Sequence, residues 1–228
     1  MMGACRAVAS ARRRAALTAL LFLAASEVQA QVTINGGLGW SGGYDIGQSS
    51  AQLRTNAPGA TPPPFTLFNV DSRIAPSPGG EVRVGVAITP RFTVEGGVLL
   101  ANRRLAFAIS EDPESAAQQL GGETLHQYVF DGGVTWELPV LRLSRVRTFA
   151  SGGAGYLRQL HQDRTLVETG QIYYVGGGAR YWLRGRPPSS RSLGIRGDVR
   201  VNMRLDGIDF EDRSRTYPTL SLLMFLGL

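Results

Sequence analysis

Apolar and polar residues alternate with a period of two along most of the chain after residue 31. The alternation is clearest in the segment 192–206, where polar residues separate the members of one apolar face: Leu193, Ile195, Gly197, Val199, Val201, Met203 and Leu205. Successive side chains of a strand point to opposite faces, so this pattern predicts strands with one apolar and one polar face. No segment after residue 31 shows a convincing apolar stripe with helical spacing. The sequence therefore predicts an all-β protein.

Eight segments of this kind follow one another, with predicted bounds of about 32–44, 80–89, 91–107, 123–138, 146–160, 169–184, 192–206 and 214–228. The connections after the first, third, fifth and seventh segments are polar or rich in Pro and Gly: 45–79, 108–122, 161–168 and 207–213. The other connections are mostly shorter, so we expect the long loops to lie together at one end of the sheet. The stretch 45–79 contains six prolines and is predicted to be a large, irregular, mobile loop.

Two segments have an ambiguous phase. In the third segment the apolar positions change parity after Asn102, to Leu105, Phe107 and Ile109, which predicts a bulge or a bend. In the fifth segment the outward face could carry either Phe149 or the set Ala150, Ala154 and Tyr156.

Three all-β architectures fit the alternation: a soluble sandwich, a soluble ligand-binding barrel and a transmembrane barrel. Most segments reach 10 to 16 residues. Strands of soluble proteins usually have about five or six residues, whereas strands that cross a bilayer need about 9–11. Aromatic residues lie near segment ends, glycine pairs recur inside strands, and the last segment stays apolar up to Leu228. These signals favour the transmembrane barrel.

Composition and charge narrow the classes further. The chain is 43% hydrophobic and has no run of about 18 to 20 uncharged apolar residues, which argues against global disorder and against a helical membrane protein. Residues 1–30 read as a cleaved signal peptide, because a region with four Arg precedes the apolar core 15–25 and small residues precede Gln31. Cleavage removes Cys5 and leaves 20 Arg against 17 acidic residues, which lowers the net charge from +6 to +3.

The segments Gly152-Gly153-Ala154-Gly155-Tyr156 and Gly176-Gly177-Gly178-Ala179-Arg180-Tyr181, with the signal peptide and eight strands, resemble the small outer-membrane β-barrel proteins of Gram-negative bacteria. The resemblance implies an eight-stranded antiparallel up-and-down transmembrane β-barrel over 31–228, without a peptidoglycan-binding domain. It also implies a location in the cell outer membrane, with membrane lipid, lipopolysaccharide and the barrel-assembly machinery as partners. Members of this family typically end on an aromatic residue, whereas this chain ends on Leu228 and has Phe225 fourth from the end.

In such a barrel the polar face points into the lumen. The predicted lumenal charges are Arg83, Glu95, Asp131, Glu137, Arg180, Arg196, Asp198, Arg200 and Arg204, with Glu81 and Arg184 beside them. Arg and carboxylate groups pair readily, and side chains nearly fill an eight-stranded barrel, which favours a salt-bridged plug and a structural or adhesive role. A porin-like alternative is a narrow, Arg-biased path for small anions. A third interpretation is a periplasmic lipocalin-like barrel, in which Val201 would line an apolar cavity and Arg200 would face water.

The sequence predicts no catalytic residue, cofactor site or metal site. Barrel enzymes that trim lipid A use a lipid-facing His with a Ser two residues later, whereas this chain has His126-Gln127-Tyr128. His161 and the acidic groups Glu111-Asp112, Asp206, Asp209, Glu211 and Asp212 fall in predicted loops, where solvated charge is the expected role. The Arg residues on strands are interleaved with acids and aliphatics, which argues against nucleic-acid binding. No oligomeric state is indicated.

Overall fold

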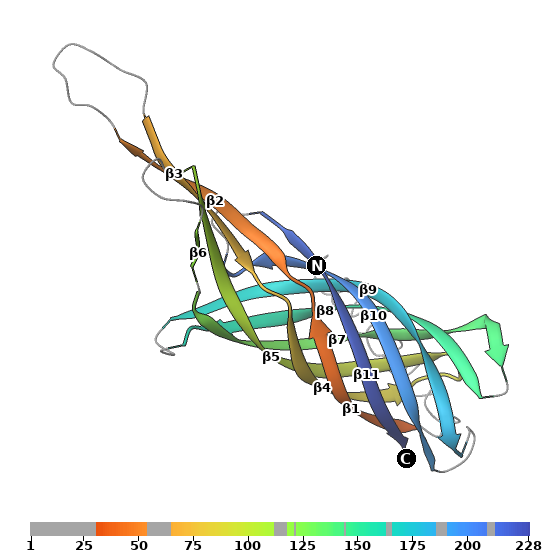
Figure 1. Ribbon diagram of the computed structural model, residues 1–228. Helices are drawn as coiled ribbons and strands as arrows, with labels where there is room; N and C mark the ends of the chain where they lie inside the picture. Colours follow the sequence, from red (N-terminus) through yellow and green to blue (C-terminus); the bar gives the residue numbers. More distant parts are fainter. Residues whose placement is uncertain are drawn as a thin grey trace, which may run out of the picture.

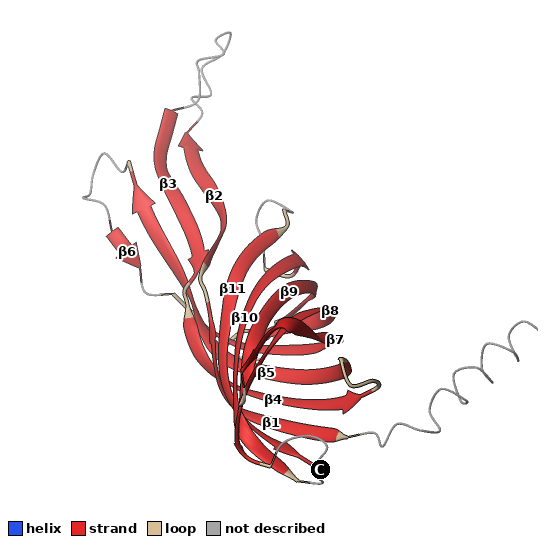
Figure 2. Cartoon of the chain, turned by 90° about the vertical axis from the view of Figure 1, so that its right-hand side faces the viewer, coloured by secondary structure: helices blue, strands red, loops and turns tan. Residues whose placement is uncertain are grey.

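The computed structural model describes residues 31–53, 65–111, 118–120, 122–143, 145–162, 166–185, 191–208 and 213–228. The predicted signal peptide 1–30 lies outside these residues, as do four of the acidic residues of the predicted loops: Asp112, Asp209, Glu211 and Asp212. In the described part of the chain every regular element is a β-strand (Figure 2).

Eight strands pair in a ring (Figure 1). In ring order they are β1 (Val32–Ser41), β4 (Ser77–Ala87), β5 (Phe92–Ser110), β7 (Thr124–Leu143), β8 (Val146–Leu160), β9 (Val167–Arg184), β10 (Ser192–Asp206) and β11 (Arg215–Gly227). Every pair is antiparallel, and β11 returns to β1 over a register from Thr33↔Gly227 to Ser41↔Thr219. The predicted all-β antiparallel sheet is therefore confirmed, and the eight predicted segments coincide with these strands to within a few residues.

A second group of strands extends beyond the ring. It contains β2 (Tyr44–Leu53), β3 (Phe65–Ile74) and the short β6 (Gln118–Leu120). Both β3 and β6 pair with the last part of β5. The β2–β3 hairpin projects from the end of the ring opposite to the C-terminus (Figures 1 and 2). The prediction of one irregular loop over 45–79 is therefore wrong, because its described part is mostly this hairpin and the start of β4.

The two faces of the ring strands differ sharply in burial. Along β10 the accessible and inaccessible side chains alternate, so that Arg200 is 4% exposed and Val201 is 48% exposed. The polar face therefore points into the ring, and the apolar face points out. In β8 Phe149 is buried inside while Ala154 and Tyr156 are exposed, which settles the phase of the fifth predicted segment.

The predicted bulge in the third segment is wrong. Strand β5 pairs with β4 and β7 without a register irregularity, and Leu99, Arg103 and Leu105 all point inward. The apolar residues change face along β5 because the interior of the ring becomes apolar near the β2–β3 hairpin. Eleven buried residues form that apolar cluster: Tyr44, Ile46, Ile74, Leu99, Leu105, Leu125, Val129, Leu157, Ile172, Ile208 and Tyr217.

Candidate functional site

The most distinctive chemistry of the molecule lies inside the ring. Of the nine charged residues predicted to face the lumen, eight are buried there in one connected set of ion pairs: Arg83, Glu95, Asp131, Glu137, Arg180, Arg196, Asp198 and Arg200. Glu81 belongs to the same set. Arg204 also points inward, but it lies in a separate layer, nearer the β2–β3 hairpin. Arg184 lies at the end of β9 and is exposed, so it does not join the buried charges as predicted.

Six of these side chains form a closed circuit of alternating charge. Its members in order are Arg83, Glu81, Arg200, Asp198, Arg196 and Glu95, which returns to Arg83. The nitrogen-to-oxygen distances along this order are 2.8, 2.7, 3.7, 2.7, 2.7 and 3.6 Å. The two longer contacts lie within ion-pair range but exceed hydrogen-bond length. Each charge in the circuit therefore has an opposite charge on both sides.

Four more side chains branch from the circuit. Asp131 of β7 accepts from both terminal nitrogens of Arg83, one of them at 3.1 Å. Arg180 of β9 donates to Glu95 at 2.7 Å and lies 3.8 Å from Glu137, which accepts from Arg147 at 2.8 Å. The full network, which we call the lumenal ion-pair network, thus contains five Arg and five carboxylates and has no net formal charge.

Small residues on neighbouring strands make room for these large side chains. A Cβ on Gly97 would lie 3.0 Å from the Arg83 guanidinium. A Cβ on Gly133 or Gly153 would collide with the hydroxyl of Tyr174, which accepts from Arg83 at 3.4 Å. Glycines on the inward face therefore leave room for the large side chains of the network.

Aromatic rings complete the packing of the network. The guanidinium of Arg196 lies 4.6 Å from the ring centroid of Phe149, and that of Arg180 lies 5.3 Å from it. A cation over an aromatic face is attracted by the ring quadrupole, and the attraction is stronger where water is excluded. Phe149 thus provides a cation-binding surface in addition to apolar volume.

A second layer closes the interior towards the hairpin. The guanidinium of Arg103 lies against the stacked rings of Tyr44 and Tyr217, at 4.9 and 5.4 Å from their centroids. Arg204 lies 4.9 Å from the Tyr44 centroid and donates to the Tyr44 hydroxyl at 2.8 Å. Tyr44 comes from β2, so the hairpin supplies part of this layer.

Arg103 is held without a carboxylate. It donates to the carbonyl oxygens of Gly42 and Ala75, and no carboxylate of the described residues lies within ion-pair distance of it. An Arg side chain keeps its proton in proteins, so the layer holds a buried cation that carbonyl groups and aromatic rings solvate.

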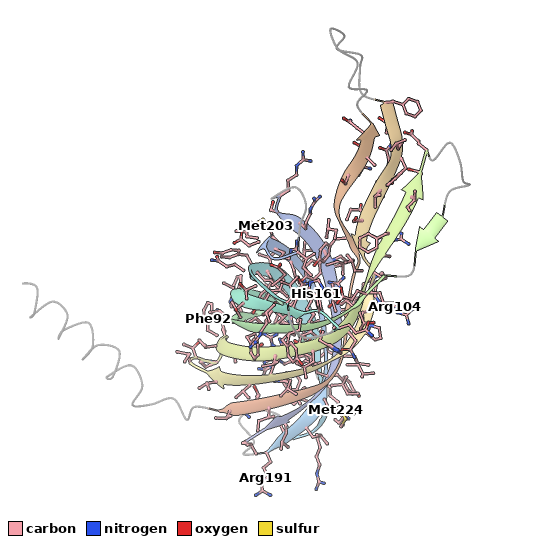
Figure 3. The ribbon with its side chains drawn as sticks, turned by 90° about the vertical axis from the view of Figure 1, so that its left-hand side faces the viewer. Phe92, Arg104, His161, Arg191, Met203 and Met224 are labelled. Atoms are coloured by element: carbon pink, nitrogen blue, oxygen red, sulfur yellow. The ribbon has the colours of Figure 1, made fainter. Side chains whose placement is uncertain are left out.

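The outward face of the ring has the opposite character. Aromatic side chains form two levels: Tyr128, Tyr156 and Tyr173 nearer the hairpin, and Phe92, Trp136 and Tyr181 nearer the C-terminus. The rings of Phe92 and Trp136 stack with centroids 6.2 Å apart. Between the two levels the outward residues of the ring strands are apolar or glycine, except for Thr148 of β8, whose register partner is Ala179. We call this band the apolar belt, and Figure 3 shows Phe92, Met203 and Met224 on its surface.

The remaining candidate groups are dispersed. His126 faces outward and its Nδ1 lies 2.8 Å from Oδ1 of Asn102. His161 bonds Glu123 through Nδ1 at 2.8 Å. Within the described ranges no three His, Cys, Asp or Glu side chains come together as metal ligands. The described residues also contain no helix of the length and hydropathy needed to cross a membrane.

Sequence reasoning missed Arg147, Arg103 and the hairpin residue Tyr44 as interior groups. Arg147 lies on β8, whose phase the sequence left open, and Arg103 lies where the apolar residues of β5 change face. A signal for Arg103 was nevertheless present, because it has the same parity as Glu95 on the same uninterrupted strand.

Comparison with known proteins gives similarities of structure but no match of sequence. No family model matches the sequence, and no curated protein sequence matches it. The outer membrane protein OprG from Pseudomonas aeruginosa is 10% identical over 87% of this chain and 95% of its own, with a TM-score of 0.46. The outer membrane protease OmpT from Escherichia coli is 9% identical over 88% of this chain and 96% of its own, with a TM-score of 0.30. Both of these proteins are outer membrane proteins by name.

Proposed function

We propose that this protein is an outer-membrane β-barrel whose lumen is closed by the lumenal ion-pair network, and that it has a structural or adhesive role. The observation that carries the proposal is the inverted distribution of polarity, with ten paired charges inside the ring and an uncharged belt outside. Water-soluble barrels distribute polarity in the opposite way, and a lipid-facing surface requires an apolar band between aromatic girdles.

The dimensions of the apolar belt support the same conclusion. Two strands of the belt carry an aromatic residue at both levels, and each spans nine residues between them. These are β7, from Tyr128 to Trp136, and β9, from Tyr173 to Tyr181. A tilted strand needs about 9–11 residues to cross the hydrocarbon core. The projecting β2–β3 hairpin then lies outside the membrane, on the side of the long connections, where an adhesive surface would be accessible.

The composition of the network favours a plug over an anion path. Five Arg and five carboxylates cancel in formal charge, whereas a selective path for anions needs an excess of cations along its walls. The two further buried cations, Arg103 and Arg204, are engaged by carbonyl groups and tyrosines. A limited permeability role is therefore the weaker candidate.

The two other interpretations fit the geometry poorly. A lipocalin-like carrier needs Val201 inside and Arg200 in water, and their exposed fractions of 48% and 4% are the reverse of that requirement. A lipid-modifying enzyme needs a nucleophile or a base beside an outward histidine, and His126 bonds the amide of Asn102. Loss of a lipid-modifying activity in a His126→Ala variant would restore the enzymatic interpretation.

Three measurements test the proposal. Cell fractionation should place the protein in the outer membrane, and the folded protein should migrate faster than the boiled protein in electrophoresis. Reconstitution in a planar bilayer should give no resolved single-channel conductance. Recovery in the soluble periplasmic fraction would overturn the membrane location, and steady anion-selective conductance of the folded protein would overturn the plug.

A further inference from the structure

A cluster of polar groups lies on the outward face of the ring, just beyond the apolar belt on the hairpin side. Its members are Asn102 and Arg104 of β5, His126 of β7 and Arg158 of β8. Asn102 is the register partner of His126, and Arg158 is the partner of Tyr128, two residues further along β7. Side chains at such direct and diagonal positions on one face lie within reach of each other. We call this cluster the rim patch.

The arginines of the rim patch differ from those inside the ring. Each of the five Arg of the lumenal network contacts at least one carboxylate, whereas Arg104 and Arg158 contact none among the described residues. Both side chains are exposed. Figure 3 places Arg104 on the outside of the ring, at the base of the hairpin. Two guanidinium groups, on the strands β5 and β8 that flank β7, are thus free to donate to an external anion.

The outward surface between the rim patch and the apolar belt is apolar. The outward neighbours towards the belt are Leu100, Tyr128, Phe130 and Tyr156, with exposed fractions of 47%, 36%, 45% and 46%. A ligand that contacts both surfaces must carry negative charge at one end and hydrocarbon at the other. An exposed apolar surface continuous with unpaired cations therefore indicates an anionic lipid rather than a free ion.

A cleft beside Arg104 gives room for a large polar head group. It has a volume of about 750 Å³ and lies between the hairpin, the end of β5 and the start of β11. Its lining includes two carboxylates and three further arginines: Asp45, Asp71, Arg73, Arg213 and Arg215. A cleft lined by both signs of charge offers donors and acceptors to the hydroxyl groups of a sugar.

We infer that the rim patch binds the phosphate groups of a phosphorylated glycolipid in the outer leaflet, an inference that rests on the proposed membrane location. Arg104 and Arg158 donate to phosphate oxygens, and the acyl chains lie along the belt beneath Tyr128 and Tyr156. His126 donates Nδ1–H to Asn102 and presents Nε2 to the head group. Guanidinium groups suit this role because their donors match the geometry of phosphate oxygens.

The test measures lipid binding to the purified, folded protein in detergent by native mass spectrometry. The probes are diphosphoryl lipid A, its monophosphoryl form and inorganic phosphate. The patch variant is Arg104→Gln/Arg158→Gln, and the matched control is Arg91→Gln/Arg184→Gln, which removes the same charge from exposed positions at the other end of the ring. The faster migration of the unboiled protein confirms that each variant is folded.

The wild-type protein should bind the diphosphoryl form more tightly than the monophosphoryl form. The patch variant should bind the diphosphoryl form about tenfold more weakly, since it loses two charge-assisted contacts, and the control should stay within about twofold of wild type. Equal losses in both variants, no loss in the patch variant, or competition by millimolar inorganic phosphate would each overturn the inference. A wild-type protein that fails to insert into membranes refutes the proposed function instead, so the two failures are distinguishable.

Discussion

Arg196 of β10 donates to Glu95 of β5 at 2.7 Å, although the two residues are 101 positions apart in sequence. In the ring, β5 and β10 are separated by three strands on either side. The pair therefore joins opposite walls and fixes the width of the interior at this level. Arg83 and Tyr174 make a second such contact, between β4 and β9. The stability of the ring should consequently depend on side chains that no local strand pairing would identify.

Replacement of Glu95 by Gln should destabilise the folded protein strongly. Glu95 contacts Arg83, Arg180 and Arg196, so its neutralisation leaves three buried cations with one carboxylate fewer. The loss of one partner from a buried pair costs about 3–5 kcal/mol. Urea unfolding in micelles, followed by tryptophan fluorescence, measures the change. Glu168→Gln, which lies outside the network, serves as the control, and an equal shift in both variants would contradict the proposed energetic role.

Gly132 and Gly133 provide a matched pair of neighbouring residues. Gly133 points inward, where a side chain would collide with the Tyr174 hydroxyl and with the backbone of Gly152, whereas a Cβ on Gly132 has only a carbonyl oxygen 3.9 Å away. Gly133→Val should therefore lower the free energy of unfolding by about 1–3 kcal/mol or more, because it overpacks the interior. The refolding yield should fall as well. Gly132→Val should stay within about 0.5 kcal/mol of wild type. Similar effects at both positions would refute the assignment of faces.

An Arg scan along the outward face of β10 tests the apolar belt. Val199 lies in the middle of the belt and Met203 at its hairpin-side edge. On a lipid-facing strand, an Arg costs about 2–4 kcal/mol at the midplane and about 0–1 kcal/mol near the interface. Val199→Arg should thus destabilise the protein in lipid vesicles far more than Met203→Arg. A soluble barrel would tolerate both exposed substitutions equally.

Tyr44 should hold the β2–β3 hairpin against the ring. Its ring stacks on Tyr217 with a centroid distance of 5.1 Å and lies against the guanidinium groups of Arg103 and Arg204. Tyr44→Ala removes these contacts and should cost about 2–4 kcal/mol locally. Limited proteolysis of the folded protein should then cleave the hairpin faster. Tyr44→Phe, which keeps the ring but loses the hydroxyl, should have an intermediate rate, and Ser49→Ala on exposed β2 should behave as wild type.

The ring strands could be predicted from sequence because each lies between two chemically different environments. Every second residue of β10 meets the polar interior and every other one meets the outside, so Arg200 and Val201 belong to opposite sets. The same reasoning failed for β2 and β3, since much of the projecting hairpin is accessible on both faces. A segment such as 48–52 has no buried face to impose alternation.

The candidate site could be predicted only as a set of residues. Parity places Arg83, Glu95 and Arg196 inside, but their pairing depends on how far each strand is shifted along its neighbour, which alternation does not encode. Phe149 shows a second reason for failure, because the interior uses an aromatic ring beside Arg196 where polarity alone would place it outside. The apolar layer around Ile46 and Ile208 also depends on residues from outside the eight ring strands.

The balance of charge inside the ring has a consequence for how the chain is assembled. Glu95 of β5 pairs with Arg196, and Glu81 of β4 pairs with Arg200. Both arginines belong to β10, which is among the last strands to be made. A nascent sheet that stops before β10 would hold these carboxylates without their later partners in a region poor in water. Sheets that lack the last two strands should therefore be unstable. Closure of the ring should be cooperative, because β10 and β11 supply the missing arginines and the remaining strand pairings together.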